Sequence, residues 1–320
     1  MEIKPSFIEL YKTGTLGKKS REAGDLLSHC TLCPRNCGVN RLQGQLGYCR
    51  SGLLPTVSSY NIHHGEEPPI SGTRGSGTIF FSRCNLSCCY CQNWPISQLG
   101  QGREVTAERL AGMMMELQQR GCHNINLVTP SHMTAQILMA LETAVRQGFD
   151  LPLVYNTSGY DSLDSLKLLE GVIDIYLPDI RYTDPGAAER YSGAGDYPAV
   201  NQAALKEMWR QVGELQLDDR GIALRGMLVR HLVLPNGLSQ TREALKFLAG
   251  EISPQVHLSL MSQFFPAHRA NQTAELGRSI TREEYRQAVQ WAEEFGLENG
   301  WHQELDDTGG GPSDRIVKAT

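Results

Sequence analysis

The sequence predicts an α/β protein with a parallel sheet at its centre, and two observations support this fold class. From residue 76 onward, short β-branched or aliphatic runs alternate with amphipathic segments of helix length, which is the pattern of repeated βα units. The runs expected to form strands are apolar almost throughout, as in strands covered on both faces. The chain of 320 residues is long enough for one large domain of this type with a small appendage.

The elements follow from these runs in order. Strands are expected at residues 77–81, 125–128, 153–155, 173–177, 227–234 and 256–261. Helices are expected between them at residues 105–120, 135–147, 163–170, 200–215 and 242–249. A sixth helix begins after Thr281, because Glu284 three residues later completes a capping box. Six βα units are fewer than a closed (β/α)8 barrel needs, so an open partial barrel and a doubly wound sheet both remain candidates.

Composition and charge exclude several classes of function. The net charge is −5, with 40% hydrophobic and 20% charged residues, which is ordinary for a globular protein and gives no basic surface for nucleic acid. The first residues contain no apolar signal segment, and the apolar stretch at 223–235 is interrupted by Arg225, Arg230 and His231. We therefore expect no membrane span and no signal peptide, and a cytoplasmic location.

Nine cysteines are the most informative feature of the composition. Four lie at residues 30–49, four lie at residues 84–91, and Cys122 stands alone. Because disulfides do not persist in a reducing cytosol, the two groups are interpreted as metal sites, whereas Cys122 is interpreted as an ordinary buried cysteine.

The second group contains the pattern C-x3-C-x2-C directly after the first expected strand, in Cys84, Cys88 and Cys91. Three thiolates can bind three irons of a [4Fe–4S] cluster and leave the fourth iron open to another ligand. Zinc is the alternative, with Cys89 or a distant histidine as fourth donor. Consecutive cysteines do not easily face one tetrahedral centre, so Cys89 is expected to take no part.

This motif, with aromatic Tyr90 before Cys91, resembles the radical S-adenosylmethionine (radical SAM) superfamily. The resemblance implies that the amino and carboxylate groups of S-adenosylmethionine chelate the open iron. It also implies that an electron from the cluster cleaves the sulfonium, giving methionine and a 5′-deoxyadenosyl radical that abstracts hydrogen from a substrate.

Residues 30–303 further resemble a group of uncharacterised proteins related to pyruvate formate-lyase activating enzyme. The matching segments are residues 30–41, 65–72, 91–94, 124–132 and 155–160. The expected elements place a partial (β/α)6 TIM-like barrel at residues 76–305, after a cysteine-rich metal-binding cap at 1–75 and before a Gly-rich, flexible tail at 306–320. The resemblance to the activating enzymes implies a protein or peptide substrate, such as a glycine of a glycyl-radical enzyme, and an electron donor such as flavodoxin or ferredoxin.

The same resemblance suggests which side chains surround the cofactor. The activases carry a Gly-Gly-Glu motif after their second strand, where this chain has Thr129 and His132 but no carboxylate. Their acid and base after the fourth strand correspond to Asp179 and Arg181, with guanidinium suited to binding a carboxylate. The other cofactor-binding candidates are Tyr90, Asn156, Thr157, Arg230 and Gln263.

Two further features lie before the first expected strand. Cys30, Cys33, Cys37 and Cys49 have the spacing C-x2-C-x3-C-x11-C, a complete ligand set for a structural zinc or for a second iron–sulfur cluster, and the short first run favours iron–sulfur. The adjacent Glu66 and Glu67 form either a solvated loop or part of the active site.

Three functions therefore remain open from the sequence. The leading hypothesis is hydrogen abstraction from a protein or peptide in the manner of the activases. An alternative within enzymes is radical modification of a peptide side chain or a small molecule. An alternative of another class is a metal-binding scaffold without S-adenosylmethionine cleavage, suggested by the missing Gly-Gly-Glu motif.

Overall fold

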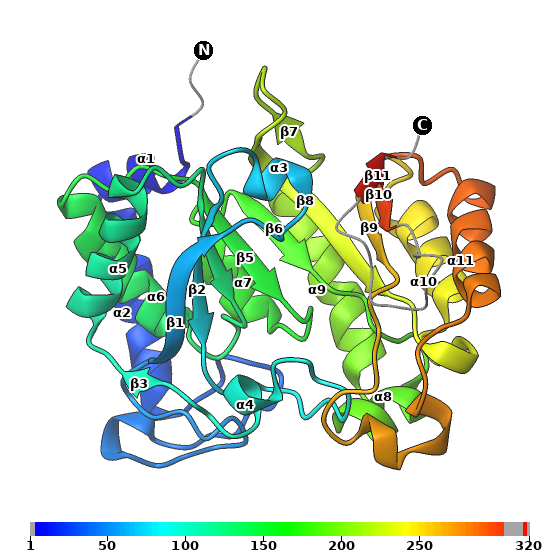
Figure 1. Ribbon diagram of the computed structural model, residues 1–320. Coiled ribbons are helices and arrows are strands. Elements are labelled where there is room, and N and C mark those ends of the chain that lie inside the picture. Colours follow the sequence, from blue (N-terminus) through cyan, green and yellow to red (C-terminus); the bar gives the residue numbers. More distant parts are fainter. Residues whose placement is uncertain (1–3, 304–315, 319–320) are drawn as a thin grey trace.

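A computed structural model describes residues 4–303 and 316–318, and its centre is a mostly parallel sheet (Figure 1). The strand order is β11-β10-β9-β8-β6-β5-β4-β2-β1-β3, with β7 paired to β8. Neighbouring strands run parallel from β2 to β10. These parallel strands are β2 (Ser76–Phe81), β4 (Ile125–Val128), β5 (Leu153–Thr157), β6 (Ile175–Pro178), β8 (Ala223–Leu232), β9 (His257–Met261) and β10 (Gly300–Gln303).

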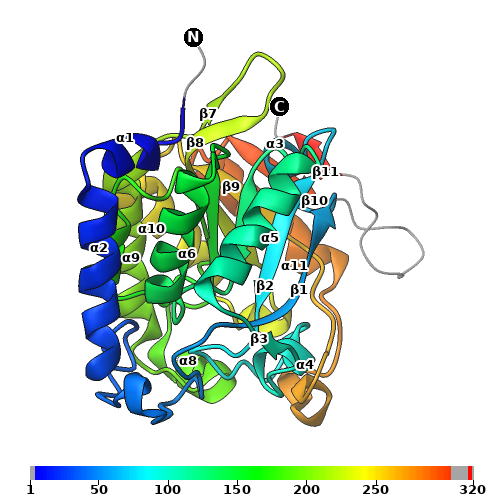
Figure 2. The same ribbon diagram turned by 90° about the vertical axis from the view of Figure 1, so that its left-hand side faces the viewer.

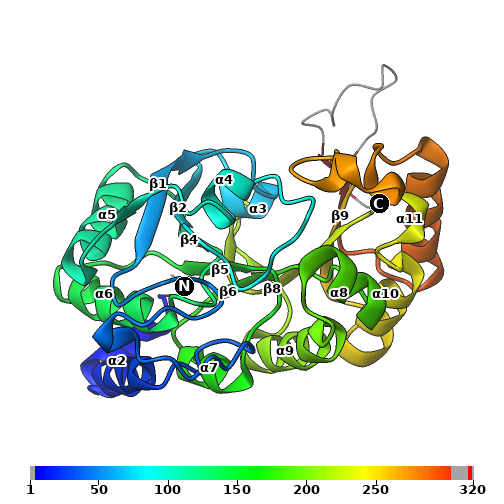
Figure 3. The same ribbon diagram turned by 90° about the horizontal axis from the view of Figure 1, so that it is seen from below.

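Helices cover the outer side of the sheet. Seen from below, the strands form an open arc with the helices around its convex side (Figure 3). They are α5 (Ala107–Gln119), α6 (Thr134–Arg146), α7 (Leu163–Leu169), α8 (Pro185–Ser192), α9 (Tyr197–Val212), α10 (Thr241–Phe247) and α11 (Arg282–Glu294). The α/β class and the open partial barrel are thus confirmed, and so is the capping box of Thr281 and Glu284. The strand β10 extends the parallel series beyond the six strands expected.

The first 75 residues contribute to the same layers. Helices α1 (Phe7–Lys12) and α2 (Thr15–Asp25) lie on the outer side, where α2 packs against α6 (Figure 2). Strand β1 (Thr56–His63) pairs antiparallel with β2, and β3 (Arg103–Glu104) pairs antiparallel with β1. Most of β1 is only half-buried, so its sequence lacks the apolar run that marks the inner strands.

Short elements complete the described part of the chain. They are α3 (Pro68–Ser71), α4 (Trp94–Ser97), β7 (Gln216–Leu217), β11 (Ile316–Lys318) and short helical turns at residues 26–28, 41–43, 235–237, 248–252, 270–272 and 274–276. Of the expected tail, residues 306–315 and 319–320 lie outside the described residues, whereas 316–318 pair with β10. In the part of the chain that is described, no helix has the length and apolar character needed to cross a membrane.

Strand register brings polar side chains to a common level inside the arc. Asp179 forms a parallel bridge with Arg230 just beyond β6, and Arg230 is in turn opposite Ser259 of β9. In β4, Asn126 is buried within an otherwise apolar strand. A polar residue in such a strand is tolerated only where it finds a partner, so these positions mark a polar interior.

Candidate active site

A cavity of about 470 Å³ occupies the concave side of the arc and extends past the carboxyl ends of the strands. Its volume falls in the range of small-molecule and cofactor sites. Eleven of the twelve residues proposed from the sequence to bind the cofactor line it: Cys84, Cys88, Tyr90, Cys91, Thr129, Asn156, Thr157, Asp179, Arg181, Arg230 and Gln263. His132 is the exception.

The cysteine loop follows β2 and is fixed by backbone hydrogen bonds to the end of α8. The amide of Ser87 donates to the carbonyl of Ser192, and the amide of Cys89 donates to the carbonyl of Tyr191. The loop turns back on itself where the Cys91 amide donates to the carbonyl of Cys88. Cys89 does not line the cavity.

The three thiols of the motif all line the cavity. Burial, and next the neighbouring Cys88, raise the pKa of the Cys84 thiol to about 12. Such thiols are poor anions unless a metal compensates their charge, and three of them form the donor set of an iron–sulfur cluster. Between residues 4 and 303, no three His, Cys, Asp or Glu side chains are placed so that they could hold a metal ion as they stand.

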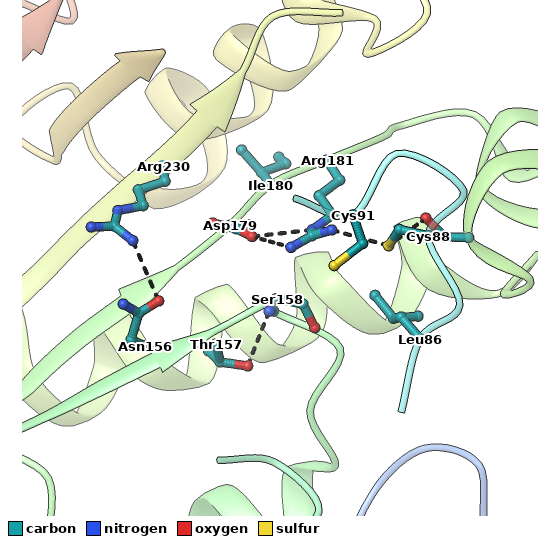
Figure 4. Close-up of polar contacts among 12 residues, drawn as sticks. Leu86, Cys88, Cys91, Asn156, Thr157, Ser158, Asp179, Ile180, Arg181 and Arg230 are labelled. Carbon is teal, nitrogen blue, oxygen red and sulfur yellow. Dashed lines mark hydrogen bonds and ion pairs between the residues drawn. The ribbon is translucent and has the colours of Figure 1, made fainter. Parts of the chain in front are cut away.

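Polar hydrogens surround the sulfur of Cys88. Arg181 Nη1 and the hydroxyl of Ser192 each lie 3.0 Å from Cys88 Sγ. The same guanidinium pairs with Asp179 at 2.6 Å through Nη2 and at 3.1 Å through Nε, so Arg181 joins a carboxylate to the cysteine (Figure 4). Hydrogen bonds to cluster sulfurs tune the reduction potentials of iron–sulfur proteins.

Residues 78–207, which include all three cysteines of the motif, match the family model of the radical SAM superfamily. This segment of the chain is therefore similar to radical SAM proteins. Enzymes that match this family model use a [4Fe–4S] cluster and S-adenosylmethionine. The thiol triplet, its burial and its polar contacts fit the cluster.

Individual proteins are similar over longer stretches. The chain is 28% identical over 298 residues to the uncharacterized protein MJ0674 of Methanocaldococcus jannaschii, an alignment that covers 91% of this chain and 82% of that protein. The crystal structure of Streptococcus suis SuiB bound to precursor peptide SuiA aligns with a TM-score of 0.48 and 10% identity. That alignment covers 70% of this chain and 47% of the SuiB chain, so this chain matches less than half of SuiB.

Removal of the Arg181 charge is expected to lower the reduction potential of the radical SAM cluster. A cation beside a cluster sulfur stabilises the more negative, reduced form, so Arg181→Met makes reduction harder. Asp179→Asn is the matched variant of opposite sign, because it leaves the guanidinium uncompensated and raises the potential. An EPR-monitored redox titration measures both; equal potentials in the two variants contradict the assignment.

The strand ends place the remaining radical SAM candidates around the cavity. Tyr90 is buried, and its hydroxyl oxygen accepts a 2.5 Å hydrogen bond from Tyr182. Thr129, where the activases have Gly-Gly-Glu, has a φ of +60°, which is strained for a β-branched residue and typical of functional positions. Thr157 donates to buried Asp161 at 2.6 Å, so its hydroxyl is engaged within the fold.

A buried ion network forms the inner wall of the cavity. Arg230 binds Glu67 through two hydrogen bonds of 2.7 and 2.6 Å, and the same guanidinium contacts Glu66. Burial alone would raise the pKa of Glu67, but the charge and hydrogen bonds of Arg230 outweigh it, so this pKa lies below its ordinary value. The Glu66–Glu67 loop therefore lines the cavity, and Arg230, expected at S-adenosylmethionine, is committed to these carboxylates.

His132 does not lie at the radical SAM cavity, contrary to the expectation that it reaches the cofactor. It lies in the turn before α6 and is buried, and its Nε2 lies 3.0 Å from the carbonyl oxygen of Ser82. Burial lowers the pKa of His132 to about 4, so the ring is neutral at pH 7. It lines a second cavity of about 10 Å³ together with Cys30, Cys33, Cys37 and Cys49.

Several residues of the site were missed by sequence reasoning. Asn126 donates to Glu66 at 2.9 Å, Ser259 lines the cavity next to Glu67, and Ser192 contacts Cys88. Asn126 and Ser259 could have been found, because each is a polar residue inside an apolar strand. Ser192 is the last residue of α8 and lies 104 residues from Cys88 in the sequence. Nothing in the sequence around it indicates a place in the site.

A glycine after β5 fixes the position of Asp179. Gly159 has a φ of +73°, and a Cβ there would overlap the backbone oxygen of Asp179 and the side-chain nitrogen of Asn201. Gly159→Ala is expected to cost at least ~3 kcal/mol of unfolding free energy, because backbone strain and overpacking add. Gly148→Ala is the control: its φ is +95° with no atom within 4 Å, so only strain of about 1–2 kcal/mol applies. Thermal unfolding compares them, and equal losses contradict the steric argument.

Proposed function

We propose that this protein reductively cleaves S-adenosylmethionine and uses the resulting radical to remove a hydrogen atom from a protein or peptide. The observation that carries the proposal is that Cys84, Cys88 and Cys91 line one cavity together with Asp179 and Arg181, and that Arg181 contacts the sulfur of Cys88. When bound there, the cluster supplies one electron to the sulfonium, releasing methionine and a 5′-deoxyadenosyl radical.

The protein's own residues hold and orient the reactants. The three cysteines bind the cluster, and Arg181 donates a hydrogen bond to one of its sulfurs. Thr129, Asn156 and Gln263 offer carbonyl, hydroxyl and amide groups along the cavity wall for S-adenosylmethionine. The cavity walls exclude water from the reacting atoms, which protects a carbon radical from side reactions.

The substrate we propose is a glycine of a partner protein, whose Cα hydrogen moves to the 5′-carbon and leaves a glycyl radical. The resemblance of the motif segments to those of the activases supports it. Radical modification of a peptide side chain or a small molecule is the second candidate. The electron comes from a low-potential donor of the flavodoxin or ferredoxin class.

We also propose a second metal centre at Cys30, Cys33, Cys37 and Cys49, with an iron–sulfur cluster favoured and zinc as the alternative. All four thiols line one small cavity. Burial is the largest cause that raises the pKa of Cys33, to about 12, and the other three thiols raise it further. A bound metal would offset the negative charge that these thiols carry as thiolates.

The experiment is anaerobic incubation of the reduced, cluster-loaded protein with S-adenosylmethionine, followed by measurement of 5′-deoxyadenosine. Candidate partner proteins are then added with glycine deuterated at Cα. Deuterium in 5′-deoxyadenosine together with a glycyl EPR signal supports the glycine substrate. Cleavage without transfer from any peptide favours the small-molecule candidate, and no cleavage by a protein with a confirmed cluster contradicts the function.

A further inference from the structure

His132 lies between the N-terminal cysteines and the radical SAM loop. Its side chain is 1% exposed, and it shares the small cavity with all four N-terminal thiols. The Nε2 atom lies 3.0 Å from the backbone oxygen of Ser82. A carbonyl oxygen only accepts hydrogen bonds, so Nε2 carries the proton and Nδ1 presents a lone pair.

The Nδ1 atom is buried and has no hydrogen-bond partner. A buried acceptor without a donor is uncommon in native proteins, and an unplaced ion is one of its explanations. Neutral imidazole nitrogen is also the commonest nitrogen ligand of metals in proteins, where its other nitrogen is usually held by a carbonyl or carboxylate. The contact to Ser82 supplies that second partner.

We propose that His132, through Nδ1, is a ligand of the metal centre at the N-terminal thiols and takes the place of the exposed Cys37 among its four protein ligands. The proposal rests on the second metal centre inferred above and not on S-adenosylmethionine cleavage. His132, Cys30 and Cys33 form the buried side of the site, whereas Cys37 is exposed. Mixed sulfur and nitrogen donors suit zinc and iron–sulfur clusters alike.

A buried cation compensates the charge of these thiolates. Arg41 is 1% exposed, its Nη1 lies 4.0 Å from the sulfur of Cys30, and the same nitrogen donates to the backbone oxygen of His132 at 2.8 Å. Burying a guanidinium is costly unless an anion is near. Thiolates bound to a metal provide this negative charge.

Three contacts connect the N-terminal cysteine site to the loop that carries Cys84, Cys88 and Cys91, or to the residues just before it. His132 contacts Ser82, two residues before the first cysteine of the motif. Arg35, in the N-terminal cysteine segment, donates to the backbone oxygen of Asn85 at 2.8 Å. The hydroxyl of Tyr48 lies 2.8 Å from that of Ser87. The N-terminal segment therefore contacts the loop that carries Cys84, Cys88 and Cys91.

The test uses the full chain with Cys84→Ser, Cys88→Ser and Cys91→Ser, so that bound metal reports on the N-terminal site alone. Iron, zinc and sulfide are measured after anaerobic loading with iron and sulfide or with zinc. His132→Asn in this background is expected to lower metal retention against a chelator by at least ~10-fold. The matched control is His231→Asn, which removes an equally buried histidine whose two nitrogens bind Ile180 and Thr241.

Spectroscopy of the chain with intact His132 keeps the test independent of variant folding. Nitrogen hyperfine coupling in the reduced cluster, or cobalt(II) absorption typical of mixed sulfur and nitrogen ligation, supports His132 as a ligand. A pure sulfur signature, or equal retention by His132→Asn and His231→Asn, overturns it. Absence of any bound metal in the background chain contradicts the second centre as well, while S-adenosylmethionine cleavage is assayed separately in the unaltered chain.

Discussion

Replacement of Cys88 by alanine is expected to reduce 5′-deoxyadenosine formation to the level of protein without a cluster. Cys88 is buried, and its sulfur is the acceptor for both Arg181 and Ser192, so it holds the most constrained position of the three cysteines. Removing one of three protein ligands leaves two irons without a protein sulfur, and the cluster is then lost or labile. Product is measured by chromatography after anaerobic loading and reduction, with iron and sulfide determined on the same sample.

Cys89→Ala is the matched control for this variant. It removes a neighbouring thiol of the same loop that does not line the cavity, and the backbone contacts of Cys89 to Tyr191 and Arg269 remain. We expect near-normal iron content and product formation. Loss of the cluster in Cys89→Ala with retention in Cys88→Ala would reverse the ligand assignment.

Arg230→Met is expected to cause the largest loss of stability among the variants considered. The substitution leaves Glu66 and Glu67 buried without their cation, and breaking a buried ion pair from one side costs about 3–5 kcal/mol. In the unaltered protein, the lowered pKa of Glu67 contributes stability above the ordinary glutamate pKa, and this contribution is lost as the pH falls through the lowered value.

The variant reverses the sign of this pH dependence. Without Arg230, burial raises the pKa of Glu67, so the variant is least stable at neutral pH and recovers as the carboxyl takes up a proton. The gap in melting temperature between the two proteins therefore narrows from pH 7.5 to pH 5. A gap that stays constant or widens contradicts the ion-network account.

Two other variants serve as controls for Arg230→Met. Adding Glu66→Gln and Glu67→Gln removes both unpaired charges and is expected to restore part of the stability. Arg225→Met changes another arginine of β8, one that donates to Ser6 and to the backbone of Gln211, and is expected to cost less. The difference between the two arginines isolates the buried charges.

The sequence was sufficient to predict the inner strands and the cysteine loop, because both depend on local pattern. An apolar run such as 125–128 is needed wherever a strand is covered on both faces, and its observed bounds are the predicted ones. The spacing of Cys84, Cys88 and Cys91 likewise brings three thiols together on one short loop. Edge strands such as β1 are half-exposed and lack such a run.

The partners of charged residues could not be predicted, because they depend on tertiary contacts. Arg230 was expected to bind the cofactor, but its partner Glu67 lies 163 residues away, between β1 and β2. His132 precedes a helix that follows β4, and only the position of the N-terminal segment decides that it faces cysteines instead of the cavity. A single sequence contains no signal for such long-range pairing.

The open arc has a further consequence for the behaviour of the protein in concentrated solution. A sheet that does not close has two edges, and unpaired edge backbone is a template for aggregation. Here β1 is irregular between Val57 and Ser59 and is followed by the two-residue β3, while the other edge ends in the three-residue β11. Because β3 pairs with β1 only at Thr56 and Val57, the rest of the outer edge of β1 is where pairing with another chain is expected, whereas the short β11 offers little backbone at the other edge.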